Sequence, residues 1–175
     1  MRLFRSVLVG AGLAAASILM ALPGQAAPAD PPTPPAPQTA EQQAPPRSDP
    51  REAYRRISRL EAERLGVPYA LVDAVMRVES AYNPLASGAA GEVGLMQIMP
   101  PTVRMLGHQG SNQDLATPET NIRLGATYLA GAWKLAKQDI CTAVMKYRAG
   151  HNETRFSVLS VRYCVRVREH LASLG

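Results

Sequence analysis

The sequence contains few cysteines and few aromatic residues, and it lacks the common nucleotide-binding loops. Its 175 residues include two cysteines, and no CxxC spacing is present, which excludes a zinc ribbon and a thioredoxin-like motif. Neither GxGxxG nor the P-loop pattern occurs, so the corresponding phosphate-binding sites are excluded. Aromatic residues make up 5% of the chain, and we therefore expect a core of Leu, Val, Ile, Met and Ala.

The charge composition favours a globular domain whose partner is an acidic polymer. Charged residues make up 19% and hydrophobic residues 46% of the chain, which is typical of a folded protein rather than a disordered one. The formal net charge is +5, and it falls to +3 if Arg2 and Arg5 are removed with an N-terminal segment, since 5 − 2 = 3; a positive charge of this size suits an anionic polymer such as a cell wall or an acidic glycan. No Lys and Arg cluster is interleaved with aromatic residues, so nucleic acid is not expected as a partner.

Residues 1–26 have the layout of a secretory signal peptide. A short basic start is followed by an apolar run over residues 7–22, which is short for a membrane-spanning helix, and small residues precede a cleavage site after Ala26. An uncleaved N-terminal anchor is the alternative. No cysteine lies near the cleavage site, so lipid attachment there is excluded. The sequence resembles bacterial signals and predicts export to the periplasm, with no stable membrane span after cleavage.

Residues 27–47 are predicted to be a spacer without a core. They contain eight prolines, with Gln, Ala and Thr between them, a composition typical of a semi-rigid polyproline linker. The spacer acts either as a tether that lets the domain reach its target or as a passive linker. The folded domain is therefore expected over residues 48–175.

The helix start and stop signals within residues 48–175 predict an all-α domain. Asp49 and Glu52 resemble a capping box with Pro50 at the first helical position, and Gly66 ends that helix. Any β structure is expected to be limited to the loop over residues 85–95. The expected helices cover residues 50–65, 68–82, 95–99, 102–106, 117–135, 140–147 and 157–174.

Glu79 lies on the apolar face of its predicted helix. At 100° per residue, with Val72 at 0°, Glu79 falls at about −20°, in the middle of an arc formed by valines and Met76. Burial of a carboxylate without a partner is costly and raises its pKa, and a carboxylic acid that stays protonated near neutral pH can act as a general acid. The alternative is a buried glutamate satisfied by internal hydrogen bonds.

Cys141 and Cys164 are expected to form a disulfide that joins the helix over 140–147 to the last helix. Two cysteines in an exported protein usually pair. The alternative is a catalytic thiol, for which His151 is the nearby candidate base. His108, His151 and His170 are expected at the surface, and because they have no metal-ligand spacing, neither a metal nor a cofactor is expected.

Several motifs resemble the soluble lytic transglycosylase family of lysozyme-like enzymes. The sequence reads E-S-A-Y-N-P over residues 79–84 and G-L-M-Q-I-M-P over residues 94–100, and this pair of motifs is highly specific. Further matches are N-I-x-x-G-x-x-Y-L over residues 121–129, Y-x-A-G over residues 147–150, and the aromatic start of the last helix at Tyr163. The resemblance covers about residues 67–170 and implies a goose-type, lysozyme-like helical fold.

The resemblance implies a lyase that cleaves the β-1,4 bond between N-acetylmuramic acid and N-acetylglucosamine in peptidoglycan without water. It would leave a 1,6-anhydromuramoyl end, with Glu79 as the single general acid and base. An ordinary glycosidase needs two carboxylates, whereas this reaction can use one. The resemblance further implies substrate contacts for a set of residues around Glu79, which are Ser80, Met96, Gln97, Tyr147, Arg148 and Tyr163.

The sequence departs from the family pattern at several positions. Arg148 replaces an asparagine, which puts the sugar contact at this position in doubt; the alternative is a cation directed toward the peptide or lactyl group of muramic acid. Glu92 lies in a loop that usually reads differently. Cys164 replaces an apolar residue. These changes suggest a subfamily whose protein partners belong to an envelope or secretion complex. Two alternatives stay open: a hydrolytic, goose-type muramidase with Glu92 as its second carboxylate, and a non-catalytic glycan-binding module of the envelope.

Overall fold

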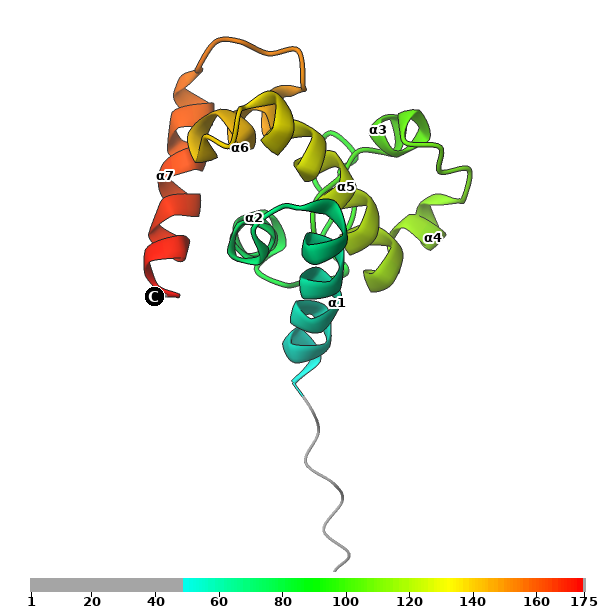
Figure 1. The fold of residues 1–175 in the computed structure, drawn as a ribbon. Coiled ribbons are helices and arrows are strands. Elements are labelled where there is room, and N and C mark those ends of the chain that lie inside the picture. Colours follow the sequence, from blue (N-terminus) through cyan, green and yellow to red (C-terminus); the bar gives the residue numbers. More distant parts are fainter. Residues whose placement is uncertain (1–48, 175) are drawn as a thin grey trace, which may run out of the picture. The chain divides into compact units, whose positions relative to one another are not determined.

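The structure, a computed structural model, describes residues 49–174, and this part of the chain is all-α as predicted. The predicted signal peptide and spacer lie outside the described residues. Apart from isolated bridges in the loop before α3, the described residues form helices, turns and bends (Figure 1). The helices are α1 (Pro50–Leu65), α2 (Tyr69–Ser80), α3 (Pro100–Met105), α4 (Asn112–Leu115), α5 (Pro118–Leu135), α6 (Ile140–Ala149) and α7 (Val158–Ala172).

The start of α1 differs in detail from the prediction. The Asp49 carboxylate accepts a hydrogen bond from the N–H of Arg51 at 3.0 Å, rather than from Glu52 as a capping box requires. Gly66 ends the helix in the left-handed conformation at φ 66°, as predicted. The capping box of this domain lies instead at α4, where Ser111 and Asp114 each bond the other's backbone N–H. The sequence analysis missed α4.

The predicted helix over residues 95–99 is wrong. These residues form turns, and Val93 and Ile98 pair with each other in an isolated antiparallel bridge. Gly94 and Gln97 have φ angles of 74° and 44°, which are left-handed and interrupt any helix. Bridges therefore extend to Ile98, beyond the 85–95 loop to which β structure was expected to be limited.

The prolines after this segment begin a helix instead of interrupting one. Pro100 and Pro101 occupy the first turn of α3, where a missing N–H costs no hydrogen bond.

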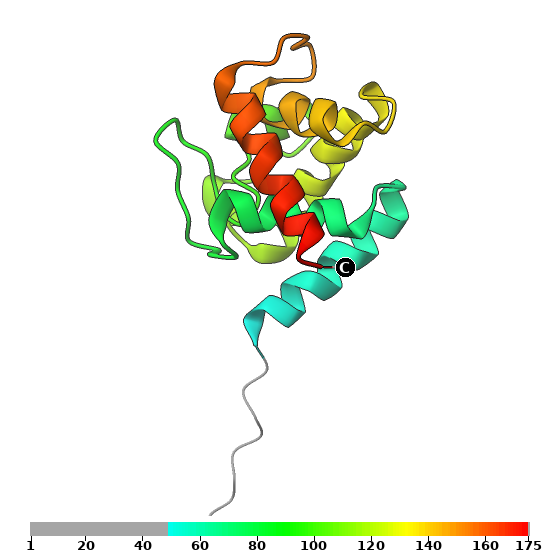
Figure 2. The ribbon, with the colours of Figure 1, turned by 90° about the vertical axis from the view of Figure 1, so that its left-hand side faces the viewer.

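The core lies between α2, α5 and the helices that cover them. α5 packs against α1 and α6, and α7 packs against α2 and α6 (Figures 1 and 2). Most of the buried residues are aliphatic or methionine, as expected. Three tyrosines are also buried, namely Tyr82, Tyr147 and Tyr163, and two of these belong to the site described below.

Cys141 and Cys164 form the predicted disulfide, which joins α6 to α7. The two cysteines are 23 residues apart in the sequence. By the chain-entropy argument, a crosslink of this loop length stabilises the folded state by roughly 3 kcal/mol. Because Tyr163 immediately precedes Cys164, the crosslink also holds the first half of α7 against α6.

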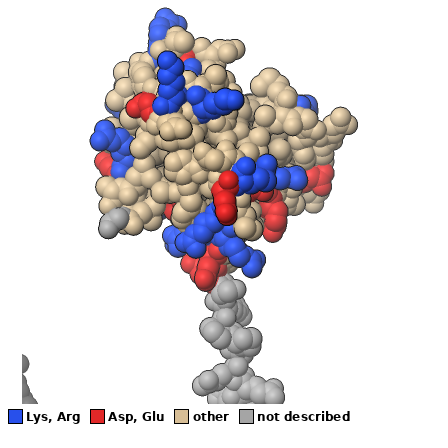
Figure 3. All heavy atoms as spheres, in the orientation of Figure 1, with Lys and Arg blue, Asp and Glu red and all other residues tan. Residues whose placement is uncertain are grey.

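Charged side chains are unevenly distributed over the described surface. On the face in Figure 3, they gather over α1 and toward the end of the molecule where α6 and α7 meet, whereas the middle is mostly uncharged. Within residues 49–174, none of the helices has the length and hydropathy that crossing a membrane would require.

Candidate active site

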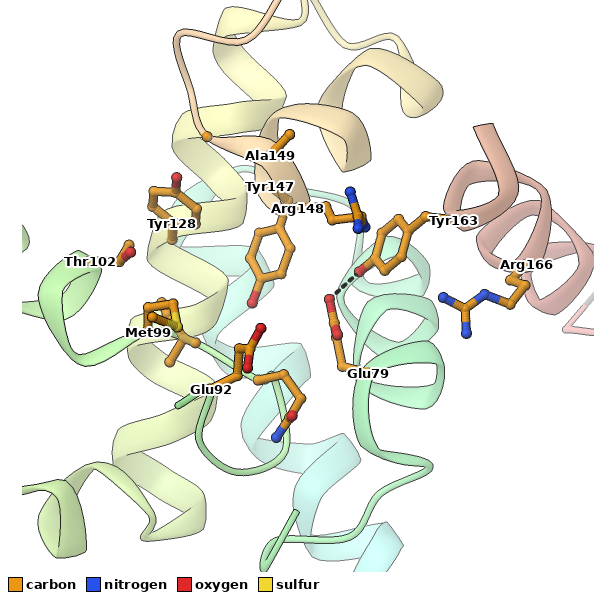
Figure 4. Close-up of a pocket in the computed structure, with 13 residues that line it drawn as sticks. Glu79, Glu92, Met99, Thr102, Tyr128, Tyr147, Arg148, Ala149, Tyr163 and Arg166 are labelled. Atoms are coloured by element: carbon orange, nitrogen blue, oxygen red, sulfur yellow. Dashed lines mark hydrogen bonds between the residues drawn. The ribbon is translucent and has the colours of Figure 1, made fainter. Parts of the chain in front are cut away.

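Glu79 lies in the last turn of α2, and its half-buried side chain faces a cavity of about 400 Å³ (Figure 4). The Tyr163 hydroxyl, carried by α7, donates a hydrogen bond of 2.6 Å to Oε1 of Glu79. The helix ends directly afterwards, because Ala81 adopts a left-handed conformation at φ 51°. Glu79 is therefore placed by a regular helix while its carboxyl group reaches open space.

Burial raises the pKa of Glu79 to about 7. The Tyr163 hydroxyl and the guanidinium groups of Arg166 and Arg148 act in the opposite direction, because they favour the carboxylate, whereas nearby Glu92 adds to the rise in the pKa. A group with this pKa is about half protonated at neutral pH. It can therefore give up a proton in one step and take one back in the next.

The loop over residues 94–97 contributes Gln97 to the wall of the cavity and is fastened to three helices. The Ser80 hydroxyl, from α2, donates to the Leu95 carbonyl at 2.7 Å. Asn121, from α5, accepts from the Met96 N–H at 2.8 Å. The Tyr147 hydroxyl, from α6, donates to the Met96 carbonyl at 2.7 Å. Ser80, Asn121 and Tyr147 belong to separate sequence motifs on three different helices, and all three hold the same loop in place.

Two glycines allow this loop to approach α5 closely. A Cβ atom on Gly125 would lie 2.6 Å from the Met96 side chain, and one on Gly94 would lie 2.5 Å from the amide of Asn121. Gly94 also has a φ of 74°, which an L side chain rarely adopts. Larger residues at either position would push the loop away from α5 and displace the cavity wall.

The structure brings together five of the seven site residues predicted from the sequence. The cavity is lined by Glu79, Gln97, Tyr147, Arg148 and Tyr163. Ser80 does not line it; its hydroxyl supports the loop instead. Met96 is fully buried and packs against Gly125, so its side chain belongs to the core rather than to the wall.

Gln97 lines the cavity, and its amide nitrogen is held by backbone carbonyl groups. Its Nε2 donates to the carbonyls of Ala86 and Gly94 at 3.0 and 2.9 Å, which leaves Oε1 as the acceptor available to a ligand. Tyr147 and Tyr163 have pKa values well above the usual range, because both phenols are buried and lie near Glu79. Both therefore remain neutral hydrogen-bond donors.

Glu92 lines the same cavity from the loop opposite Glu79 (Figure 4). Its Oε2 accepts a hydrogen bond from the Ala90 N–H at 3.0 Å. This contact braces the carboxylate on its own loop while leaving it beside the open space. Glu79 and Glu92 therefore place two carboxyl groups, in different environments, at the same cavity.

Sequence analysis missed Arg166 as part of the cavity wall, and Tyr128, which it recognised as a motif residue and favoured as core, also lines the cavity. Arg166 follows Tyr163 by three residues, so helical spacing would have placed it on the same side of α7. The Tyr128 ring stacks on His151, with centroids 4.0 Å apart and planes 8° apart, and the His151 ring also bonds the Tyr128 carbonyl at 3.0 Å. His151 is half-buried by these contacts, contrary to the expected surface position.

The other two histidines are also half-buried. His170 lies 3.3 Å from the buried carboxylate of Asp73, and the expectation of a surface position was wrong for it as well. Among residues 49–174, no group of His, Cys, Asp and Glu is arranged to hold a metal ion.

Comparison with known proteins agrees with this architecture. The family description "Transglycosylase SLT domain" matches residues 57–162, and the chain belongs to this family. The resemblance inferred from the motifs is thereby confirmed.

Two of the proteins with similar sequences are named as lytic murein transglycosylases. "Soluble lytic murein transglycosylase" of Escherichia coli (strain K12) is 36% identical over 95 residues, which are 51% of this chain and 15% of that protein. "Membrane-bound lytic murein transglycosylase C" of Haemophilus influenzae (strain PittEE) is 35% identical over 92 residues, covering 49% of this chain and 25% of the relative. The chain thus spans a quarter or less of the length of these relatives.

The fold also resembles a crystallised enzyme. An inactive mutant of the lytic transglycosylase Slt from Pseudomonas aeruginosa superimposes with a TM-score of 0.62 at 28% identity, covering 70% of this chain and 24% of that one. The lysozyme-like helical fold expected from the sequence is confirmed by this likeness and by the family match.

Proposed function

We propose that this protein is a peptidoglycan lytic transglycosylase that cleaves the bond between N-acetylmuramic acid and N-acetylglucosamine and leaves a 1,6-anhydromuramoyl end. The main observation in support of the proposal is the environment of the Glu79 carboxyl group and its pKa. Its carboxyl group faces an open cavity, its pKa is about 7, and a buried tyrosine donates to it. Family membership and the names of the relatives support the same activity.

Glu79 performs two proton transfers in this proposal. The protonated carboxyl group first donates its proton to the glycosidic oxygen, and the bond from that oxygen to the muramoyl C1 breaks. The N-acetyl group of the substrate assists at C1. The Glu79 carboxylate then removes the proton from the C6 hydroxyl of the same sugar as its oxygen bonds to C1. No water is consumed, and Glu79 ends protonated as it began.

The neighbouring residues tune and position this group. The Tyr163 hydroxyl donates to the carboxylate that forms between the two steps and so stabilises the intermediate state. Gln97 presents Oε1 to an N–H of the substrate, for which an acetamido group is the natural donor. Tyr147 holds the 94–97 loop through its bond to the Met96 carbonyl rather than acting on Glu79 directly. The inactive mutant known for the Pseudomonas relative is a glutamate-to-glutamine change, which agrees with a glutamate as the essential group.

Hydrolysis is the second candidate, because Glu92 faces the same cavity. In a goose-type muramidase, Glu92 would act as the second carboxylate and activate a water molecule. The product would then end in a reducing sugar. The 1,6-anhydro product is favoured, since Glu92 is braced on its own loop by the Ala90 N–H.

Mass spectrometry of digested sacculi tests the proposal. We expect muropeptides lighter by one water than the corresponding reducing products, and we expect Glu92→Gln to yield the same products as the wild type. Reducing ends whose formation requires Glu92 would instead establish hydrolysis. Binding to sacculi without any cleavage, by a folded wild-type protein, would contradict both activities and favour a glycan-binding module.

We also propose that residues 1–26 direct export to the periplasm and that residues 27–47 form a spacer outside the catalytic domain. The basic start, apolar run and proline-rich composition support this division. A protein that begins at Ser48 should cleave isolated sacculi as fast as one that begins at Ala27. A loss of cleavage with an unchanged melting temperature would show that the spacer contributes to the site.

A further inference from the structure

The two halves of α7 are attached to the rest of the domain differently. Most of the first turn is exposed, since Val158 and Leu159 have exposed fractions of 68% and 56%. The loop before the helix, residues 152–157, is also mostly exposed. The second half is joined to α2, where the His170 ring lies 3.3 Å from the buried carboxylate of Asp73. The position of the first half therefore depends on the few buried residues that follow its first turn.

Two of these buried residues, Tyr163 and Cys164, link α7 to two different helices. The Tyr163 hydroxyl donates to Glu79 of α2 at 2.6 Å (Figure 4), and the Cys164 sulfur is bonded to Cys141 of α6. Consecutive residues of a helix point about 100° apart, because a turn contains 3.6 residues. The two links therefore act in different directions, and together they fix the rotation of α7 about its own axis.

The helix at the other end of the disulfide is itself well secured. The Asp139 carboxylate caps the start of α6 by accepting from the Thr142 N–H at 2.8 Å, directly beside Cys141. Near the other end of α6, the Tyr147 hydroxyl donates to the Met96 carbonyl and joins α6 to the loop before α3. α6 also packs against α5. The disulfide therefore holds α7 against a helix that is fixed at both ends.

The hydrogen bond from Tyr163 to Glu79 is sensitive to small movements of α7. It is 2.6 Å long, and a hydroxyl that moves away by about 1 Å no longer makes a hydrogen bond. A slight rotation or outward movement of the first half of α7 would therefore break it. The disulfide opposes such a movement, because the crosslinked residue is the next one in the chain.

The other groups near Glu79 respond less to a movement of this size. The guanidinium groups of Arg166 on α7 and Arg148 on α6 favour its carboxylate, whereas Glu92 from the loop before α3 favours its protonated form, as burial does. Tyr147 from α6 is neutral. Interactions between charges decline gradually with distance, whereas a hydrogen bond is lost within about 1 Å. A small displacement of α7 would therefore act on Glu79 mainly through the loss of the phenol.

We propose that the Cys141–Cys164 disulfide is a positioning element of the reaction, which keeps the Tyr163 hydroxyl within hydrogen-bond distance of Glu79 and makes cleavage depend on the redox state of the cysteines. This inference rests on the proposed function and adds a regulation of the same site. Reduction by a dithiol transfers two electrons and two protons to the S–S bond, leaves two thiols on the protein and converts the dithiol to a disulfide. Cys141 is half-buried, whereas Cys164 has an exposed fraction of 3%, so a small dithiol approaches from the Cys141 side.

The test compares the oxidised and reduced forms of the whole chain on isolated sacculi. Dithiothreitol is the reductant, and a count of free thiols confirms the state of each sample. Cys141→Ala/Cys164→Val is a second form without the crosslink, and its valine keeps an apolar side chain at the buried position. His170→Gln is the matched control, because it removes the attachment of the second half of α7 and His170 does not line the cavity. Melting curves define a temperature at which the compared forms are folded.

Opening the disulfide should lower kcat by roughly tenfold, the effect of one hydrogen bond to a charged group, with little change in KM. Because the loss of the phenol raises the pKa of Glu79, the loss of activity on the basic side should move to higher pH. The doubly substituted variant should behave in the same way and be insensitive to dithiothreitol. In Tyr163→Phe, reduction should change neither kcat nor the pH profile further. His170→Gln should lose stability and keep the kcat and pH profile of the wild type.

The contrary outcomes are distinguishable. Equal kcat and pH profiles for the folded oxidised and reduced forms would overturn the inference and leave the proposed function standing. A move of the profile to lower pH, an effect of reduction that persists in Tyr163→Phe, or the same move in His170→Gln would also overturn it. If the reduced wild type is unfolded at the assay temperature, the doubly substituted variant takes its place in each comparison. No cleavage by the oxidised protein would overturn the proposed function and this inference with it.

Discussion

α2 carries two acids in different surroundings, a buried one in its second turn, Asp73, and a half-buried one in its last turn, Glu79. Asp73 has no exposed surface and lies among several partners. The Tyr82 hydroxyl donates to it at 3.0 Å, the His170 ring lies at 3.3 Å, and Arg55 Nε lies at 3.6 Å. Glu79, six residues later, has one hydrogen bond from a side chain, and its arginine neighbours form no ion pair with it.

The comparison indicates that the number of partners, together with burial, separates a structural acid from the proposed catalytic acid on the same helix. Asp73 connects α1, α2 and α7, because Arg55 comes from α1 and His170 from α7. Its side chain therefore joins three helices and contributes to packing. Glu79 is left short of partners beside an open cavity, so its proton is available for chemistry.

The largest expected effect comes from removing the proton of Glu79. Glu79→Gln keeps the size of the side chain and most hydrogen bonding but can neither donate nor accept the catalytic proton. General acid–base catalysis typically contributes about 10²–10⁴-fold, and turnover on sacculi should fall by at least that much. Retention of more than about a tenth of the wild-type turnover would contradict the assignment, and Glu92 would be the next residue to test.

The same substitution should change how stability depends on pH. The pKa of Glu79 is about 7 in the folded state against 4.5 for an ordinary glutamate, so the folded state holds the proton more tightly than the unfolded state. Its contribution to stability is therefore complete below pH 4.5 and lost as the pH rises through 7. Between these limits, the unfolding free energy of the wild type should fall relative to Glu79→Gln by up to about 3 kcal/mol, at 1.36 kcal/mol per pH unit.

Urea unfolding of both proteins at several pH values provides this measurement. Parallel curves for the wild type and Glu79→Gln between pH 4.5 and 8 would show that Glu79 is not perturbed by folding.

Asp73→Asn should cost stability rather than catalysis. The substitution leaves Arg55 and His170 without their acid, and breaking a buried ion pair typically costs about 3–5 kcal/mol. The side chain of Arg55 is 39% exposed, so water replaces part of the lost interaction and we expect about 2 kcal/mol. Turnover per folded molecule, measured where the variant is fully folded, should stay within about threefold of the wild type. A hundredfold loss of turnover would mean that this cluster also serves the reaction.

A matched pair of tyrosine substitutions gives the smallest and most specific effects. Tyr82→Phe and Tyr163→Phe each remove one hydroxyl that donates to a carboxyl group. Each should cost about 1–2 kcal/mol of stability, the value of one buried hydrogen bond to a charged acceptor. Because the Tyr163 hydroxyl lowers the pKa of Glu79, its removal raises that pKa and should move the loss of activity on the basic side to higher pH.

Tyr82→Phe should leave the pH profile of the reaction unchanged, because Tyr82 contacts Asp73 and does not line the cavity. The measurement is kcat against pH for the wild type and both variants. A shift of equal size in both variants would contradict the separation of the two acids.

Sequence reasoning located Glu79 because helical periodicity is local. Its position relative to Val72 follows from the rotation per residue, and a charged residue in an apolar arc is visible without any tertiary information. The same reasoning missed Asp73, because Asp73 is buried by side chains from α1 and α7 that approach α2 from outside its apolar arc. The predicted helix over 95–99 failed for a related reason: Asn121, 25 residues from Met96, binds the loop backbone in place of a helical partner.

The amino-acid sequence by itself determined most of the helices, the ends of α1 at Asp49 and Gly66, and the acid on the apolar face of α2. Those features depend on propensity, capping and periodicity, which act over a few residues. The tertiary structure alone decided that Tyr163 donates to Glu79, that Met96 is core while Gln97 lines the cavity, and that Arg148 and Arg166 line the same cavity. These relations join helices that are far apart in the chain, and they depend on which faces the packing of α2, α5, α6 and α7 brings together.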